Sequence, residues 1–517
     1  MLFLAVVTLI ASLLTARAVQ APHQLRGHGL GDYVEVACAS LGAFVFTGLI
    51  AYEFVDLLPI LSIFLIVSAV TAHFSERLTA RGIVWTAAQA TILLVSPVWA
   101  YLFVTELNLP AWLEVFTLIG TGLAFLAAGA LALANFAREA ILTHERWVLP
   151  TSAPLRASKN FRPKVSLHLC CYAEPPEIVK ETIDRLADLD YDNFEVLVCD
   201  NNTADERLWR PLEAHCTALN ARMGREVFRF FHVAPLKGAK AGALNYCLEQ
   251  MDQSAEIVGV IDADYLSRKD FLARLVPLFE DPELGYVQTP HDYRDYQHSE
   301  YLTSCYWEYM PVNRVDYAGI SEYGGAFTIG TMCLLRTEAL KKAGGWADWC
   351  LTEDSEVPVR LRAVGYRGLY FVETFGRGLI PETFDDYKKQ RFRWTAGPVQ
   401  QLRRHWRLFM PSPWAPRMPG WTKLLEIARC STPLARLAGI VTLVFSLSAM
   451  AVAAASGTVE QIDVPDVSWL VLLMGALVWC VRTVHRYHLA GCYSVSNMIR
   501  GEIARASLSY VILQGGV

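Results

Sequence analysis

The sequence predicts an α/β domain with a mostly parallel, Rossmann-like sheet, inserted between two sets of transmembrane helices. Long apolar runs fill both ends of the 517-residue chain, in which 53% of the residues are hydrophobic. Between these ends, short apolar stretches alternate with amphipathic ones, as strands and helices do in βαβ units. This central part, of about 240 residues, is long enough to bury a core of its own.

Five apolar runs occupy the first third of the chain. They lie at about Leu2–Leu14, Val34–Ala51, Phe54–Ala72, Ile83–Val104 and Trp112–Phe136. The last four approach the roughly 20 residues that a membrane-spanning helix needs. The first is short, and we interpret it as a retained, marginal helix rather than a signal-peptide core. Arginines occur only in alternate connections, which predicts that residues 1–136 are transmembrane helices and that the chain after them is cytosolic.

Composition sets the remaining boundaries around the central domain, residues 165–400. Residues 137–164 combine a charged, partly apolar stretch with prolines, which is typical of an interfacial helix and linker or of an ordinary solvated connector. Residues 401–432 mix tryptophans, prolines and basic residues, which predicts amphipathic helices at the membrane surface. Residues 433–517 contain two further apolar runs and a last one too short to span, so we expect more transmembrane helices and a truncated chain.

The overall charge and the cysteines exclude some classes of function. A net charge of -5 is too small to indicate a polyionic partner, and no basic run with interleaved aromatic residues appears, so nucleic-acid binding is not expected. The twelve cysteines are scattered without the spacing of a zinc site. We interpret them as reduced thiols or small buried hydrophobic residues.

Four strands are expected to position polar residues at one edge of the sheet. They lie at Val165–Tyr172, Phe194–Cys199, Phe228–Val233 and Ile257–Ile261, and the last runs directly into Asp262-Ala-Asp264. Ligands of open α/β sheets bind beyond the carboxyl ends of the strands. Two carboxylates there suit Mg²⁺ or Mn²⁺ holding a substrate diphosphate, although such a pair is more often a helix cap or a solvated turn.

Two further polar residues follow predicted strands. Asp200, at the end of the second strand, can accept hydrogen bonds from a nucleotide base or ribose, or form an Asx-turn. Lys240 opens a helix among glycine and alanine residues, where a diphosphate can approach backbone N–H groups. The alternative for Lys240 is a solvated side chain, and Lys237 could share its role.

Two motifs lie on predicted helices in the second half of the domain. Thr352-Glu353-Asp354 precedes an apolar helix and is also an ordinary N-cap followed by acidic first-turn residues. Gln390, Arg393 and Trp394 have the spacing i, i+3 and i+4, which places an amide, a guanidinium and an indole on one helical face. A membrane-interface belt is the alternative for that face.

Seven segments, in this order, carry a resemblance to a known family: Asp200, Lys240–Asn245, Asp262–Asp264, Val287–Pro290, Gly344–Trp346, Thr352–Asp354 and Gln390–Trp394. They resemble the signature of the processive inverting family 2 glycosyltransferases, similar to cellulose, hyaluronan, chitin and curdlan synthases. The resemblance covers residues 165–400 and extends to the flanking membrane helices. It implies a GT-A-type domain over these residues.

The resemblance also implies a role for each matching residue. Asp354 is expected to be the general base, Trp394 and Glu353 to contact the acceptor, and Asp264, with Asp262, to bind Mg²⁺ or Mn²⁺. The residues expected to bind the nucleotide sugar are Asp200, Lys240, Asp262, Gln390 and Arg393.

The function expected from this resemblance is polymerisation of a β-linked glucan from UDP-glucose by metal-dependent inverting transfer, coupled to export of the growing glycan. The enzyme would be a multi-pass protein of the bacterial inner (plasma) membrane, in contact with its lipids. Alternatives are a chitin- or hyaluronan-like synthase of an amino-sugar polymer, a transferase of one sugar to a lipid carrier, and an inactive glycosyltransferase-like transporter or sensor. Phe327–Met332 replaces the family's Phe-Cys-Gly segment, and no Phe-x-Val-Thr segment or cyclic-di-GMP domain is found, so a β-glucan other than cellulose is favoured.

Overall fold

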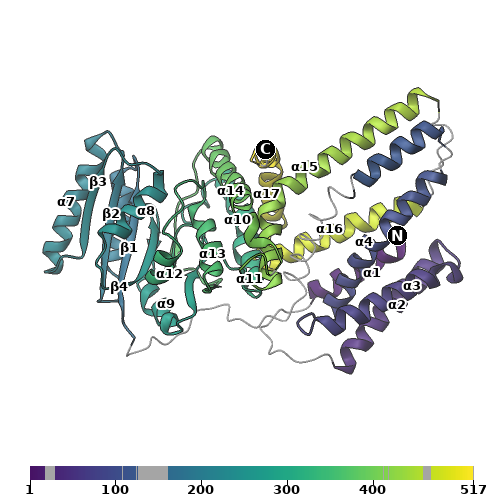
Figure 1. Cartoon of the computed structure of the whole chain (residues 1–517), viewed down its shortest axis with the longest axis horizontal. Coiled ribbons are helices and arrows are strands. Elements are labelled where there is room, and N and C mark those ends of the chain that lie inside the picture. Colours follow the sequence, from purple (N-terminus) through teal and green to yellow (C-terminus); the bar gives the residue numbers. More distant parts are fainter. Residues whose placement is uncertain are drawn as a thin grey trace. The chain divides into compact units, whose positions relative to one another are not determined.

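The computed structural model of the chain describes residues 1–17, 29–106, 109–123, 125, 161–411, 413–416, 418–457 and 467–515. Two compact units divide the chain: Met1–Leu149 with Ser431–Tyr493, and Pro150–Cys430 with Ser494–Val517. The first unit is helical where it is described, and the second contains the sheet (Figure 1).

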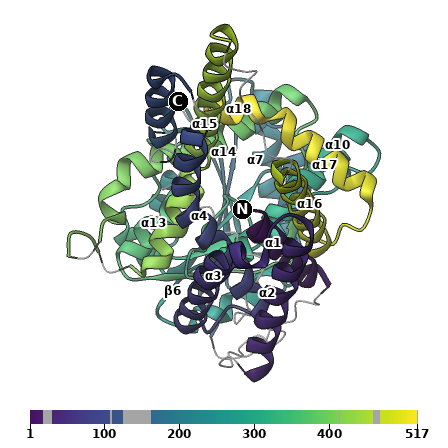
Figure 2. The same cartoon turned by 90° about the vertical axis from the view of Figure 1, so that its right-hand side faces the viewer.

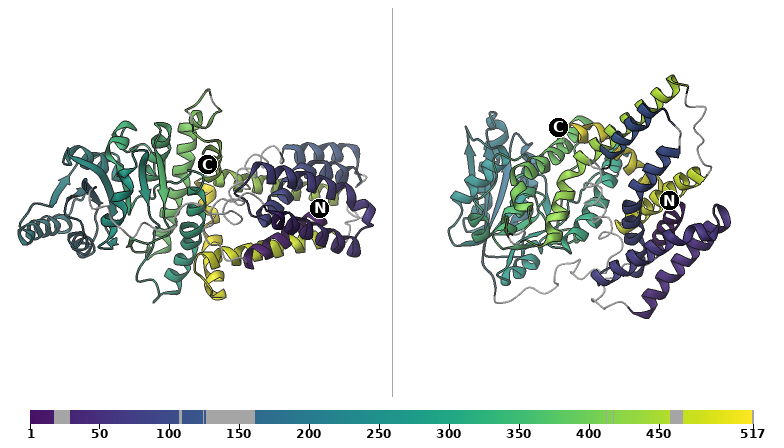
Figure 3. Two further views of the ribbon diagram at one scale, coloured as in Figure 1. Left: turned by 90° about the horizontal axis from the view of Figure 1, so that it is seen from below. Right: turned by 45° about the vertical axis from the view of Figure 1, so that its right-hand side comes forward.

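The helical unit is built from long apolar helices that pack side by side (Figures 2 and 3). They are α1 (Leu2–Arg17), α2 (Leu30–Ile50), α3 (Phe54–Phe74), α4 (Ala80–Glu106) and α16 (Val467–Leu489). The part of α15 (Gly420–Ala455) that follows Cys430 also belongs to this unit, and its Phe445 ring stacks on that of Phe116 at 5.1 Å. Among the described residues, α2, α3, α4, α15 and α16 are long and apolar enough to cross a membrane. The chain is therefore a multi-pass membrane protein. A shorter apolar helix, Ala111–Leu123, covers the start of the run predicted at Trp112–Phe136, most of whose remainder lies outside the described residues.

Helix α1 lies inside this unit rather than at its edge. It packs against α2, α4 and α16, and its residues Leu2 to Leu4 are at most 1% exposed. Thr8, Ser12 and Thr15 donate their hydroxyl hydrogens to carbonyl oxygens four residues earlier, at 2.7 to 2.8 Å. Because these hydroxyls are satisfied within the helix, they can be buried at little cost.

A seven-stranded sheet forms the centre of the second unit. Its strands, in spatial order, are β3 (Phe228–Val233), β2 (Phe194–Asn201), β1 (Lys164–Cys171), β4 (Ala255–Asp262), β7 (Cys333–Arg336), β6 (Leu284–Gln288) and β8 (Arg367–Tyr370). The first four are mutually parallel, β6 and β8 are parallel to each other, and β7 runs antiparallel to both of its neighbours. The prediction of a mostly parallel sheet is confirmed. The short strands β5 (Leu266–Ser267) and β9 (Gly376–Arg377) pair separately.

Helices cover both faces of this sheet. One face packs against α6 (Pro176–Ala187), α7 (Glu206–Met223) and α9 (Phe271–Leu275), whose apolar side chains join those of β1, β2 and β4 in a single core. The other face packs against α8 (Ala239–Gln250) and α12 (Thr337–Lys342). Strands buried on both faces explain why the sequence shows continuous apolar runs instead of alternation.

The second half of the unit adds a helical layer beside the sheet. It consists of α10 (Glu300–Pro311), a π-helical turn (Val312–Asp316), α11 (Tyr317–Ser321), α13 (Glu353–Ala363), α14 (Phe384–His405), a 3₁₀ turn (Trp406–Phe409), the start of α15, α17 (Val495–Ser507) and α18 (Ser509–Gln514). Helix α17 packs against α10, and α18 packs against α14. The boundary predicted between residues 432 and 433 falls inside α15, which is one continuous helix. Within the predicted segment 433–517, α17 and α18 are shorter than a membrane span and group with the sheet-containing unit.

Candidate active site

Polar residues gather at the carboxyl edge of the sheet because of its topology. The parallel strands β2 and β4 end there, at Asp200–Asn201 and at Asp262. Since β7 is antiparallel to β4, the segment that leads into it, Thr328–Met332, arrives at the same edge. The Thr331 hydroxyl accepts a hydrogen bond from the Asp262 backbone N–H at 3.0 Å.

The carboxylates at the end of β4 form a crowded negative site. Asp264 Oδ2 accepts a hydrogen bond from the Leu379 N–H at 2.7 Å. Burial, followed by the charge of Asp262, raises the pKa of Asp264 to about 6. Burial, together with Asp264 and Asp262, also raises the pKa of Glu174, which follows β1. Within the described ranges, no three His, Cys, Asp or Glu side chains are arranged as a complete metal-ligand set. Asp264 and Glu174, whose pKa values are raised by burial and neighbouring carboxylates, nevertheless fit a hard divalent cation, which favours the ionised form of a carboxylate.

Lys240, in the first turn of α8, lies close to Asp262 and also interacts with Glu353 and Asp354. Its Nζ donates to Asp262 Oδ1 and, at 2.9 Å, to the carbonyl oxygen of Gly330. Burial opposes the charge of Lys240, but Asp262, Glu353 and Asp354 raise its pKa above the usual range. The ammonium group is therefore charged at neutral pH. Lys237, the alternative that the sequence left open, is exposed in the loop before α8.

Two asparagine side chains fix the position of α8. The Asn202 amide binds the backbone of Leu236 twice, accepting from its N–H and donating to its carbonyl oxygen, both at 2.7 Å. The Asn245 amide binds the backbone of Trp346 in the same way, with both distances at 2.9 Å. We call these contacts the asparagine clamps. They tie the loop before α8 to the end of β2, and tie α8 itself to the segment that leads to Asp354.

Asp354 lies in the first turn of α13, where Thr352 is the N-cap residue. Its Oδ1 accepts from the Ser355 N–H at 2.7 Å. Burial raises the pKa of Asp354, whereas Lys240 opposes this rise. The neighbouring Glu353 is 8% exposed, and burial with the charge of Asp354 raises its pKa to about 7. The N-cap interpretation of this motif and a catalytic role are thus compatible.

Gly330 is required beside Asp354 by both conformation and space. Its φ is +86°, and a Cβ atom built on it would lie 2.6 Å from Asp354 Oδ2. Any side chain at position 330 would therefore be strained and would displace the carboxylate.

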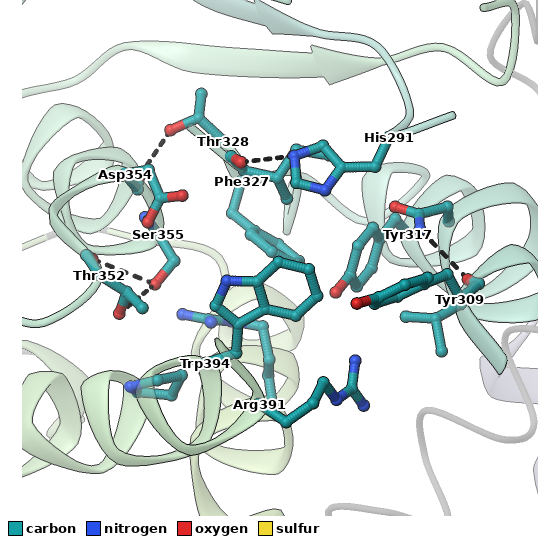
Figure 4. Close-up of a pocket in the computed structure, with 15 residues that line it drawn as sticks. His291, Tyr309, Tyr317, Phe327, Thr328, Thr352, Asp354, Ser355, Arg391 and Trp394 are labelled. Carbon is teal, nitrogen blue, oxygen red and sulfur yellow. Dashed lines mark hydrogen bonds between the residues drawn. The ribbon is translucent and has the colours of Figure 1, made fainter. Parts of the chain in front are cut away.

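A cavity of about 80 Å³ lies against Asp354. Five of the fifteen residues that line it have aromatic or imidazole rings (Figure 4). The residues that line it are His291, Tyr309, Val312, Asn313, Tyr317, Phe327, Thr328, Ile329, Thr352, Asp354, Ser355, Arg391, Trp394, Pro398 and Arg429. The Trp394 ring lies 5.7 Å from the His291 ring and 5.6 Å from the Tyr309 ring. Burial lowers the pKa of His291 to about 4, so this imidazole is neutral near pH 7.

Helix α14 contributes Arg391 and Trp394 to the cavity, whereas Arg393, predicted to bind the donor diphosphate, lies outside it. Gln390 accepts a hydrogen bond from the Tyr309 hydroxyl at 2.5 Å, and Trp394 lines the cavity as expected. Arg393 is exposed and does not line the cavity; Arg391 does, with its guanidinium 5.4 Å from the Trp394 ring centre. Arg391 Nη2 donates to the buried carboxylate of Glu308 at 3.0 Å, which holds the Arg391 side chain in place.

Asp200 lies at the sheet edge but does not line the cavity. It is 2% exposed, and both of its carboxylate oxygens have partners. Oδ1 lies 2.9 Å from His232 Nδ1, and Oδ2 accepts from the Thr203 hydroxyl at 2.7 Å. The His232 ring stacks on Trp209 at 4.3 Å. The predicted role of Asp200 in binding uridine stays a prediction.

The structure therefore unites Lys240, Asp262 and Gly330, and places Asp354, Trp394 and Arg391 around one cavity. Sequence reasoning missed four residues of this site: Glu174, His291, Arg391 and Arg429. Two of them had local signals, because Glu174 comes two residues after the first predicted strand and His291 directly follows the Val287–Pro290 segment. Arg429 had none.

Residues 163–397 match the family described as Glycosyltransferase like family 2. Over these residues the chain is similar to that family, and its mostly parallel sheet, flanked by apolar helices, has the GT-A fold of glycosyltransferases.

The comparisons with individual proteins name mannosyltransferases. The chain is 31% identical over 177 residues to a probable glucomannan 4-beta-mannosyltransferase 4 of Oryza sativa subsp. japonica, over 32% of this chain and 31% of the relative. It is 30% identical over 261 residues to glucomannan 4-beta-mannosyltransferase 1 of Cyamopsis tetragonoloba, over 48% of each. These alignments span about half, or less, of the relatives' own length. Among solved structures, the mannosyltransferase PcManGT of Pyrobaculum calidifontis has a TM-score of 0.47 and 20% identity, covering 74% of this chain and 97% of that one.

Proposed function

We propose that the protein is an inverting glycosyltransferase that extends a β-linked hexose polymer from a nucleotide-sugar donor, with Asp354 as the general base. The observation that carries this proposal is the partly buried carboxylate of Asp354 at the wall of a cavity that also has aromatic side chains in its lining, with the ammonium of Lys240 acting on it. Aromatic walls suit the apolar faces of sugar rings, and the few polar groups suit their hydroxyls.

The proposed step is a single displacement. An acceptor hydroxyl in the cavity gives its proton to Asp354, and its oxygen attacks the anomeric carbon of the donor sugar. The bond from that carbon to the phosphate oxygen breaks, and the nucleoside diphosphate leaves from the opposite face. Attack opposite the leaving group inverts an α-linked donor to a β-linked product. The proton then passes from Asp354 to solvent.

The donor side of the site is assigned to Lys240, Asp262 and Asp264. Lys240 supplies a fixed positive charge for the diphosphate, and the asparagine clamps hold its helix in place. Asp264 and Asp262 would hold a divalent cation, Mg²⁺ or Mn²⁺, whose chemistry is to neutralise charge that develops on the departing diphosphate. Arg393, exposed on α14, remains a proposed contact for that diphosphate, as do Asp200 for the uridine and Gln390 for the donor.

The donor that we propose is UDP-glucose, which gives a β-glucan. A mannose donor giving a β-mannan is the second candidate, because the curated relatives are named glucomannan 4-beta-mannosyltransferases. Processive growth of the polymer, its export and a location in the bacterial inner membrane with the α/β domain in the cytosol are part of the same proposal. Five candidate spans support a membrane location of this general kind.

The test is turnover by the full chain in lipid vesicles. Purified protein with Mg²⁺ or Mn²⁺ is given UDP-glucose, GDP-mannose, UDP-N-acetylglucosamine or UDP-glucuronate, and release of the nucleoside diphosphate is measured together with polymer. Digestion with linkage-specific glucanases and mannanases then identifies the product. We expect polymer from UDP-glucose. Polymer from GDP-mannose alone would establish the second candidate, and no turnover with any donor by folded protein would refute the enzyme.

A further inference from the structure

The end of α14 carries exposed arginine and tryptophan side chains that do not line the cavity. Arg403, Arg404 and Arg407 lie in its last turn and in the 3₁₀ turn that follows, and all three are exposed. Arg407 comes four residues after Arg403 and three after Arg404, so the three side chains are neighbours at the helix end. Trp406, between them, is 53% exposed. This end of the helix therefore presents charge and an indole ring together.

Indole rings lie against two of these arginines. The Arg404 guanidinium lies 5.4 Å from the centre of the Trp349 ring, and that of Arg407 lies 5.4 Å from the centre of the Trp406 ring. Trp349 comes from the loop before α13. A guanidinium that stacks on a ring keeps its N–H donors at its edges, where an external acceptor can reach them. We call this group the arginine–tryptophan surface: Trp349, Arg403, Arg404, Trp406 and Arg407.

The charge of this surface is not neutralised by carboxylates. Among the residues that the structure describes, none of its three arginines forms an ion pair. Residues 387–425 contain nine Lys or Arg and neither Asp nor Glu. Asp348, which precedes Trp349, lies beside Gly238 at the start of α8. By contrast, Arg207 on α7 is exposed but pairs with Asp205 at 2.8 Å. The arginine–tryptophan surface therefore suits an anionic partner.

Exposed tryptophans in the same region indicate that this anion belongs to a membrane. Indole rings suit the headgroup layer of a bilayer, where their apolar body is shielded and their N–H still meets water. The next helix, α15, begins at Gly420 and continues into a candidate membrane span. The Lys423 ammonium on its first turn donates to the Met410 carbonyl oxygen at 2.6 Å, which ties the turn after α14 to this helix. In the sheet-containing unit, four described tryptophans are 39 to 71% exposed, and all lie in this region: Trp349, Trp406, Trp414 and Trp421.

We propose that the arginine–tryptophan surface binds the phosphate groups of anionic phospholipids. Each guanidinium offers a fork of N–H donors that matches a phosphate, and an anionic leaflet attracts every arginine near it. A zwitterionic lipid carries its own ammonium group, so it competes less well for the same donors. Inorganic phosphate lacks the acyl chains that would lie beside the exposed indoles. The location of residues 401–432 at the membrane surface, expected from the sequence, is part of this proposal, which does not depend on the transfer reaction.

The test is lipid binding by the full chain in neutral maltoside micelles. Phosphatidylglycerol and phosphatidylcholine with identical acyl chains are titrated separately, and the Kd of each is measured by native mass spectrometry. An arginine near an anionic lipid surface contributes roughly fivefold. We therefore expect the wild type to bind phosphatidylglycerol roughly tenfold or more tightly than phosphatidylcholine. Substituting Arg403→Gln, Arg404→Gln and Arg407→Gln together should weaken phosphatidylglycerol binding at least about fivefold, and phosphatidylcholine binding by no more than about twofold.

The matched control removes the same charge from exposed residues of α7, by Arg207→Gln, Arg210→Gln and Arg222→Gln together. It should bind both lipids as the wild type does. The proposal is overturned if the wild type binds the two lipids equally, or if the control loses as much affinity for phosphatidylglycerol as the triple variant of α14. Displacement of the lipid by millimolar inorganic phosphate would assign the surface to a soluble anion and overturn it too. If the α14 variant has no normal melting transition, its three single substitutions are measured, and wild-type affinity in all three overturns the proposal.

Discussion

Replacing Asp354 by Asn separates catalysis from folding. The amide keeps an oxygen in place of Oδ1, so it can still accept the hydrogen bond from the Ser355 N–H. Lys240 keeps its hydrogen bonds to Asp262 and Gly330. What is lost is the negative charge at the start of α13, which contributes about 0.3 to 1 kcal/mol by interaction with the helix dipole. We therefore expect the free energy of unfolding to change by no more than about 1 kcal/mol.

The loss of turnover should be far larger. A neutral amide cannot accept the acceptor proton, and general base catalysis contributes about 10²- to 10⁴-fold. At about 1.36 kcal/mol for each factor of ten, this corresponds to roughly 2.7 to 5.4 kcal/mol in the barrier. The assay is nucleoside diphosphate release and polymer formation in vesicles, with donor binding measured separately. Donor affinity should be nearly unchanged.

Asp385→Asn is the matched control, because it makes the same chemical change in the first turn of another helix, α14. Asp385 pairs with Lys388 at 2.7 Å, is 78% exposed and does not line the cavity. It should retain wild-type turnover. If Asp354→Asn keeps more than a tenth of the wild-type rate, Asp354 is not the base. If it unfolds while Asp385→Asn does not, its role is structural.

Three further predictions follow from the donor side. Asn202→Ala removes both hydrogen bonds to Leu236, at a position with φ of +61°. It should lower the free energy of unfolding by about 1 to 3 kcal/mol and raise the donor KM more than the acceptor KM. An unchanged donor KM would contradict the role of the asparagine clamp. Gly330→Ala should lower kcat by at least tenfold, since its Cβ would meet Asp354, and a normal rate in folded protein would refute the close contact. Asp264 has its pKa raised from 3.8 to about 6, so its contribution to stability is present below about pH 4 and is lost as the pH rises through 6. Without added metal, the melting temperature of Asp264→Asn should exceed that of wild type more at pH 8 than at pH 4, and added Mg²⁺ or Mn²⁺ should stabilise only the wild type.

Much of the fold follows from local sequence. The strand predicted at Phe228–Val233 has the observed bounds, and the other three differ by one or two residues at one or both ends, because continuous apolar runs are typical of strands buried on both faces. The apolar runs at Phe54–Ala72 and Ile83–Val104 likewise became α3 and α4. The position of α1 could not be predicted in the same way. A short apolar helix with three hydroxyl residues suits burial inside a helical unit as well as it suits a membrane.

The site was predictable where one motif sits on one strand end or one helix start. Asp262, Asp264 and Asp354 are of this kind. The side of α14 that lines the cavity was not predictable. Helical spacing gives the angles between side chains around the helix axis, but not which of them turn toward the cavity. The absolute rotation of α14 depends on contacts with residues far away in the sequence, such as that of Arg391 with Glu308, a residue 83 positions earlier. Arg429 was hidden for the same reason, since a single arginine near the start of an apolar helix gives no sign of the cavity that it lines.

The order of the segments along the chain means that different parts of the site are synthesised at different times. Strands β1 to β4, with α6, α7 and α8, are contiguous in the chain and carry Lys240 and Asp262. Synthesis proceeds from the N-terminal side, so the residues of this half have all been made when about half of the printed chain has. The cavity needs every segment from His291 to Arg429, and Arg429 belongs to α15, a candidate membrane span. A nascent chain therefore acquires its donor residues well before its transfer site, and completes that site only as α15 is being made.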